Sequence, residues 1–202
     1  MTQTVTGLFD RFEDAKATVH ELERAGVPHG DISLVANDAH GNHAKVAGES
    51  AVSQDARQGA GVGALVGGTG GLLASLGLLA IPGIGPVVAA GWLTATLVGA
   101  IGGAAVGGVT GGLVGALTDA GVPERDAHIY AEGVRRGGTL VSARVDDSMA
   151  VQARSILSRD TAADVSQRGE AYRGEGWSGF DHTASPYSPE QAAAEREQYN
   201  RI

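Results

Sequence analysis

"GAIGGAAVGGVTGGLVG", at residues 99–115, carries a glycine at every fourth position: Gly99, Gly103, Gly107, Gly111 and Gly115. This spacing places all of them on one face of an α-helix. Each glycine inside a helix costs about 1 kcal/mol relative to alanine, so the face must gain energy elsewhere. Without side chains, two helix backbones can approach closely and form extensive contacts. The repeat therefore predicts a helix-packing ridge.

A matching ridge lies upstream and consists of Gly59, Gly63, Gly67 and Gly71. Between the ridges, "IPGIGPVV" contains Pro82, Gly83, Gly85 and Pro86, which predict a reversal of the chain. We therefore expect a glycine-zipper helical hairpin over residues 59–121. Its helices would span 59–81 and 87–117 and pack through their glycine faces.

The hairpin lies in a segment without Asp, Glu, Lys or Arg, residues 58–118, which we call the charge-free segment. A helix over 59–81 would be roughly 34 Å long, close to the thickness of about 30 Å of a hydrocarbon core. We expect the hairpin to insert into the inner (cytoplasmic) membrane, in contact with lipid, with the globular domain on the cytoplasmic side. The alternative is a soluble cytoplasmic homo-oligomer, a ring or filament, with the glycine-rich helices packed between subunits.

The flanking sequences read as two similar halves. Residues 1–36 give strand, helix, strand, with Asp10 and Glu13 resembling a capping box at the start of the helix. Residues 122–167 give a helix after Pro123, then the strand "TLVSARV", another helix and a last strand "AADVSQR". Two βαβ halves predict an α+β fold, a split ferredoxin-like domain with an antiparallel sheet, interrupted by the hairpin. A polar linker at 37–58 precedes the hairpin.

The composition excludes several classes of protein. The net charge is −8 and Lys and Arg are not clustered, which excludes a nucleic-acid binder. The absence of cysteine excludes disulfides and thiolate sites. The N-terminal sequence has no basic region followed by an apolar stretch, so it does not match a secretory signal.

The sequence predicts no enzyme, no cofactor and no evident small-molecule substrate. "GAGVGA" at 59–64 loosely fits a dinucleotide pattern, but a polar stretch stands where a buried strand should precede it. His40 and His43 form an H-x-x-H pattern in a polar loop, which favours solvated histidines over a metal site. No Ser, His and Asp share a hydrolase context.

The tail, residues 168–202, is expected to be partly disordered, with a short C-terminal helix. Its aromatic residues Tyr172, Trp177, Phe180 and Tyr187 are spaced too irregularly for one helix face. They are candidate docking side chains, either on another subunit or on the chain's own domain. The alternative is a disordered tail in which the aromatics have no role.

Two stretches resemble the YflT-type heat-induced general stress proteins. The stretches are 4–36 and 121–147, and the matching positions are Phe9, Asp10, Ala15, Leu22, Gly26, Asp31, Ile32, Ser33, Tyr130, Gly133, Gly137, Gly138 and Leu140. Many members of that family carry a similar glycine-rich insertion between their halves. The resemblance implies stress-associated expression and no established enzymatic activity, so it assigns no catalytic residues. The tail departs from the family's pattern.

Overall fold

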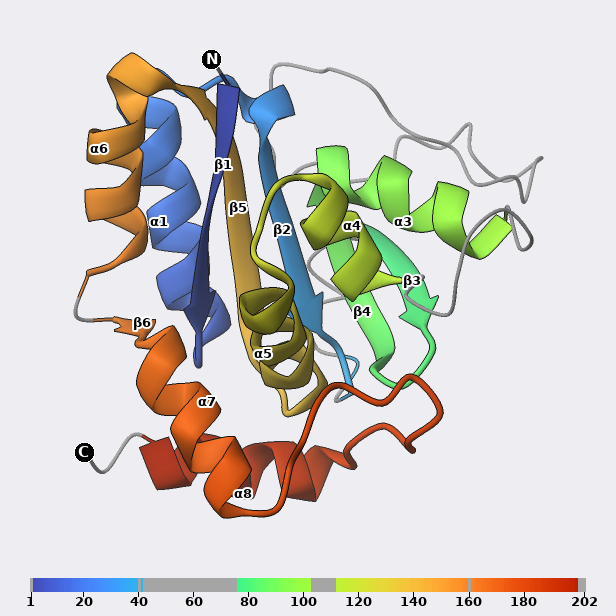
Figure 1. Ribbon diagram of the computed structural model, residues 1–202. Helices are drawn as coiled ribbons and strands as arrows, with labels where there is room; N and C mark the ends of the chain where they lie inside the picture. The colour runs from blue at the N-terminus through green and yellow to red at the C-terminus, as the bar shows by residue number, and fades with distance from the viewer. Residues whose placement is uncertain (1, 40, 42–75, 103–111, 160, 200–202) are drawn as a thin grey trace.

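The computed structural model describes residues 2–39, 41, 76–102, 112–159 and 161–199 (Figure 1). Its elements are β1 (Thr2–Phe9), α1 (Phe12–Arg24), the 3₁₀ turn η1 (His29–Asp31), β2 (Ile32–Asn37), β3 (Gly77–Ile81), β4 (Gly85–Gly91), α3 (Trp92–Gly102), α4 (Leu113–Asp119), α5 (Glu124–Arg135), β5 (Thr139–Asp146), α6 (Asp147–Leu157), β6 (Ala162–Ala163), α7 (Val165–Gly174) and α8 (Pro189–Tyr199). The strands form one sheet in the order β3-β4-β2-β5-β1-β6, and every pair is antiparallel. The predicted α+β class and antiparallel sheet are confirmed.

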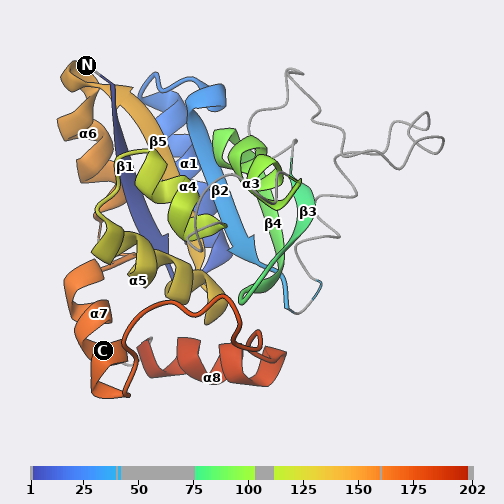
Figure 2. The ribbon, with the colours of Figure 1, turned by 45° about the vertical axis from the view of Figure 1, so that its right-hand side comes forward.

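Helices cover both faces of the sheet (Figures 1 and 2). On one face, α1 and α6 bury alternate residues of β2 such as Leu34 and Ala36. On the other face, α3, α4 and α5 bury the intervening Val35. Every residue of β2 is buried, because this strand lies in the interior of the sheet with a core on each side.

The two halves form the elements that their local patterns predict. Strand β1 pairs with β5 over eight residues, from Thr2 opposite Asp146 to Phe9 opposite Thr139. In α1, the buried face includes Ala15, Val19 and Leu22, and Gly26 follows the helix with a φ of +97°.

Two local expectations in these halves are wrong. The residue at the N-cap position of α1 is Arg11, which makes no side-chain capping bond, and Asp10 binds Arg168 instead. The expected last strand is only two residues long, because the Asp164 carboxylate accepts a hydrogen bond from the Gln167 N–H at 2.8 Å and starts α7 there.

The predicted helical hairpin is wrong over residues 77–91, whereas α3 and α4 are helical where the second helix is expected. Residues 77–91 form the hairpin of strands β3 and β4, so the predicted reversal joins two strands and not two helices. β4 pairs with β2, which buries Val87, Val88, Ala89 and Ala90 against both cores. Sheet pairing and the β-branched valines therefore outweigh the helical spacing of the small residues.

The rest of the predicted zipper is only partly within the described residues. Gly99 lies in α3 and Gly115 in α4, two separate helices that pack against each other. The other ridge positions, Gly59, Gly63, Gly67, Gly71, Gly103, Gly107 and Gly111, lie outside the described residues, as does most of the 37–58 linker. Within the part of the chain that the structure describes, none of the helices has the length and apolar character needed to cross a bilayer.

Candidate functional site

The four predicted turn residues lie together at the tip of the β3–β4 hairpin. Ile84 donates its N–H to the Ile81 carbonyl at 3.0 Å, and Gly83 has a φ of +77°. Proline followed by such a glycine is typical of a type II turn. A Cβ on Gly83 would lie 2.7 Å from the Asp181 carbonyl oxygen, and one on Gly85 would lie 2.8 Å from Cβ of Pro186. The turn therefore needs both glycines, because the tail passes directly over it.

The tail packs on the chain's own domain. Helices α7 and α8 and the loop between them extend across one end of the sheet (Figures 1 and 2). Tyr172 is fully buried, and its ring meets that of Trp177 edge to face at 5.7 Å between centroids. Phe180 packs against the core under α3, α4 and α5, and its N–H donates to Nδ1 of His128 at 3.1 Å. The Tyr187 ring lies 4.8 Å from the Arg135 guanidinium carbon. The structure thus brings Tyr172, Phe180 and Tyr187 onto the domain, and Trp177 packs on the Tyr172 ring.

At the centre of this contact lies Arg136, the residue after α5, only 6% exposed. Its Nε donates to Oε1 of Glu132 at 2.8 Å, and its Nη1 donates to Glu175 at 2.6 Å and to Glu195 at 2.8 Å. Its guanidinium carbon lies 4.0 Å from the centroid of the Tyr172 ring. Two of the three carboxylates come from the tail, so a buried positive charge of the domain joins α5 to the residues that follow α7 and to α8.

A second ion pair holds the start of α7. Both terminal nitrogens of Arg168 donate to the two carboxylate oxygens of Asp10 at 2.8 Å, a bidentate arrangement. The same guanidinium lies 3.6 Å from the centre of the Tyr199 ring. Arg168 thus connects the loop after β1 to the last residue of α8.

Burial sets the protonation of this cluster. Desolvation opposes the charge of Arg136, but its hydrogen bonds to Glu132, Glu175 and Glu195 prevail and raise its pKa, so it stays cationic. Desolvation is also the main reason that the pKa of Tyr172 lies well above its ordinary value, partly offset by Arg168 and Arg136. The phenol is therefore neutral across the physiological range. These pairings are typical of a structural clamp, not of a catalytic group prepared to react.

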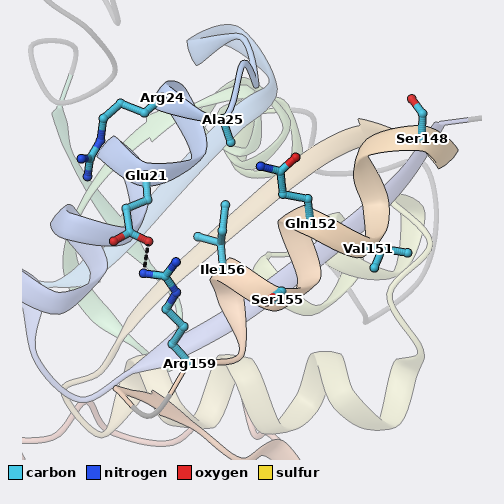
Figure 3. Close-up of a pocket in the computed structure, with 9 residues that line it drawn as sticks. All are labelled: Glu21, Arg24, Ala25, Ser148, Val151, Gln152, Ser155, Ile156 and Arg159. Atoms are coloured by element: carbon cyan, nitrogen blue, oxygen red, sulfur yellow. Dashed lines mark ion pairs between the residues drawn. The ribbon is translucent and has the colours of Figure 1, made fainter.

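An open groove lies between α1 and α6, with a volume of about 670 Å³ (Figure 3). Its lining includes Val151 and Ile156 and the charged residues Glu21, Arg24 and Arg159. Glu21 and Arg159 form an ion pair across it. No histidine lines the groove, and the Glu21 carboxylate is already paired with Arg159. The lining therefore does not form a nucleophile–base arrangement. A narrower hollow of about 360 Å³ adjoins it and shares these two residues.

Metal ligands do not come together in the described ranges: no group of three or more His, Asp and Glu side chains there could hold an ion. His40 and His43 lie outside the described residues. Asp38, beside them in sequence, is buried.

In the described part of the charge-free segment, β3, β4 and α3 form one side of the molecule, and α4 lies over the face of the sheet between α3 and α5 (Figure 2). β3 is the last strand of the sheet on this side. Leu78 on β3 is 61% exposed, although most other large apolar side chains of the described residues are buried. Reasoning from the sequence misses this edge, because the alternation of polar and apolar residues that reveals a half-buried strand is absent from an all-apolar segment.

Comparisons of the chain with protein-family models, with curated proteins and with solved structures found no match.

Proposed function

We propose that this chain is a non-enzymatic, stress-associated structural protein that assembles from copies of itself, with the charge-free segment at the contact between copies. The observation that carries the proposal is the position of that segment. Its described part is built into the domain, and its strand β3 forms the outer edge of the sheet and carries the exposed Leu78. An apolar strand at a sheet edge is a template for pairing with another chain.

The domain that carries this surface is, in our proposal, a split ferredoxin-like domain. The order β2-β5-β1-β6, with α1 and α6 packed on one face, supports this assignment, since each half then contributes a βαβ unit. On this view β3 and β4 belong to the insertion and extend the sheet beyond β2. Stress-associated expression rests on the resemblance of residues 4–36 and 121–147 to the YflT-type proteins.

A second candidate function is attachment to the cytoplasmic membrane through the charge-free segment. The observation that favours it is the length of this segment, residues 58–118, without one charged side chain. Such a run is typical of a membrane-embedded sequence. In this case lipid would be the partner, and the ferredoxin-like domain would remain on the cytoplasmic side.

Fractionation of cells expressing the full chain separates the two candidates. Self-assembly predicts that the protein is released without detergent and elutes as a species larger than its chain mass of 20.4 kDa, measured by light scattering. Membrane insertion predicts a pellet that resists carbonate and dissolves only in detergent. A detergent-free monomer at every concentration tested would refute the self-assembly proposal.

A further inference from the structure

We infer that β3 of one copy pairs antiparallel with β3 of a second copy, around a two-fold axis at Leu79. The inference rests on the proposed self-assembly and specifies its contact. β3 pairs with β4 along one side, and no other described strand pairs with its outer side.

The register of the β3–β4 hairpin determines which main-chain groups of β3 face outward. Ala80 lies opposite Pro86, which has no N–H, so this is a pair without mutual hydrogen bonds. The carbonyl of Ile81 accepts the turn hydrogen bond from Ile84, so the main-chain groups of Ile81 point toward β4. Because these groups alternate in direction along a strand, the N–H and C=O of Leu78 and Ala80 point away from β4.

The side chains of the same two residues are on the exposed face. Leu78 and Ala80 are exposed, whereas Leu79 and Ile81 pack on the opposite face against the core under α3, α4 and α5. β3 has no charged residue, no proline and no bulge, the devices that commonly prevent edge pairing. Another β-strand supplies the main-chain groups that such an edge lacks.

This edge is complementary to itself. With Leu79 opposite Leu79 of the second copy, Leu78 of each copy faces Ala80 of the other in a hydrogen-bonded pair. Each of these two pairs exchanges two main-chain hydrogen bonds, so every outward-facing N–H and C=O of Leu78 and Ala80 finds a partner. The Leu78 side chain then lies beside Ala80 of the second copy, which covers part of the exposed leucine. The second copy carries no charge here to oppose the contact.

Cysteine cross-linking tests the register, and the chain has no native cysteine to interfere. Residues facing each other in a non-hydrogen-bonded pair have Cα atoms about 4.5 Å apart, within the range of a disulfide. Under a mild thiol oxidant, we expect Leu79→Cys to form a covalent dimer. We expect Leu78→Cys to form little, because the two substituted positions would lie beyond the limit of about 7 Å. A double variant, Leu78→Cys with Ala80→Cys, alters only exposed positions and should also cross-link if Leu79→Cys does not fold.

A charge substitution tests the surface independently. We expect Leu78→Lys to weaken association by at least about tenfold, because the edge then carries a charge with no partner in the second copy. Val151→Lys is the matched control, since Val151 is an exposed large apolar residue on α6, and we expect it to leave association unchanged. Both are measured by sedimentation over a broad dilution series, with circular dichroism confirming the fold.

The outcomes distinguish this inference from the proposed function. The β3 contact is refuted while self-assembly stands if the protein assembles, Leu78→Lys matches the control, and neither Leu79→Cys nor the double variant cross-links more than Leu78→Cys. A protein that remains monomeric refutes both. A monomer in which the Leu78 and Ala80 amides are protected from hydrogen exchange would show that the chain's own residues cover the edge.

Discussion

Replacing Arg136 by methionine should release the tail from the domain. Methionine keeps much of the side-chain volume but removes the charge that Glu132, Glu175 and Glu195 share. Glu132 is only 1% exposed and would keep one ionic partner, Arg135, at 2.9 Å. Breaking a buried ion pair costs about 3–5 kcal/mol, because the remaining charge is left without compensation.

The structure indicates the lower end of that range. Arg135 compensates Glu132 in part, and Glu175 is 40% exposed, so its lost contact contributes little. Glu195, which is 12% exposed, loses its ion pair with Arg136 and contributes most of the remaining cost. The lost contact with the Tyr172 ring adds roughly 0.5–2 kcal/mol. We therefore expect the free energy of unfolding to fall by about 3 kcal/mol, a large part of the 5–15 kcal/mol typical of a domain.

The assay follows the tail separately from the sheet. The chain has two tryptophans, so in a Trp92→Phe background Trp177 alone reports the tail. We expect Arg136→Met to shift its fluorescence at lower urea than the loss of sheet circular dichroism, and to make the tail sensitive to protease. Arg125→Met is the control, because Arg125 is an exposed residue of the same helix.

Adding Glu132→Gln to Arg136→Met should recover part of the stability, because it removes the carboxylate that the first change leaves undercompensated. Equal denaturation curves for Arg136→Met and Arg125→Met would refute the reasoning. So would a double variant less stable than Arg136→Met, since the carboxylate would then not be the source of the cost.

Two further predictions test other parts of the structure. Gly91→Ala should destabilise the protein by at least about 2 kcal/mol, because φ is +85° there and a Cβ would overlap the Ile32 carbonyl oxygen. Gly174→Ala, in open space near the end of α7, should change stability by less than about 1 kcal/mol, and equal urea midpoints for the two variants would refute the β4–β2 pairing. Burial raises the pKa of all four tyrosines above the ordinary 10.0. Below about pH 10 the tyrosines are protonated in both the folded and the unfolded protein, and their burial contributes fully to stability. Above that pH the tyrosines of the unfolded chain lose their protons first, so stability falls as pH rises. Near-ultraviolet titration should show the tyrosinates of Tyr130 and Tyr172 appearing together with the loss of circular dichroism. Four tyrosinates formed at about pH 10 in the folded protein would contradict the burial.

The sequence predicts the two halves well because their information is local. Ala15, Val19 and Leu22 recur at helical spacing, and the same is true of the buried face of α5. The pairings of β1, β2 and β5 then follow, because one sheet lets the apolar faces of both α1 and α5 be buried. These elements need no knowledge of distant residues.

Residues 77–91 are different, because their small and apolar side chains fit a helix as well as a strand. What decides between the two is the free edge of β2, where β4 adds a strand and buries its valines. The contacts of the tail are also non-local. Glu175 and Glu195 bind Arg136 across 39 and 59 residues, and no short motif announces such a pairing. The aromatic composition of the tail does suggest docking, but not its target.

For β3, β4, α3 and α4, the absence of charge has a structural explanation that does not require a membrane. Leu8, Val35 and Leu140, on three strands of the two halves, point into the core that α3, α4 and the β3–β4 hairpin help to form. Without these elements, part of that sheet face would be exposed to water. Each Å² of apolar surface that is buried contributes about 25 cal/mol to folding, so this layer is a main source of stability.

The described part of the insertion therefore belongs to the core, which changes how its role can be tested. A deletion of residues 59–118 would remove this layer together with any assembly contact, so aggregation of the truncated chain would say nothing about either. Substitutions at exposed positions such as Leu78 leave the core intact. They alter the edge alone, and for that reason they can separate assembly from folding.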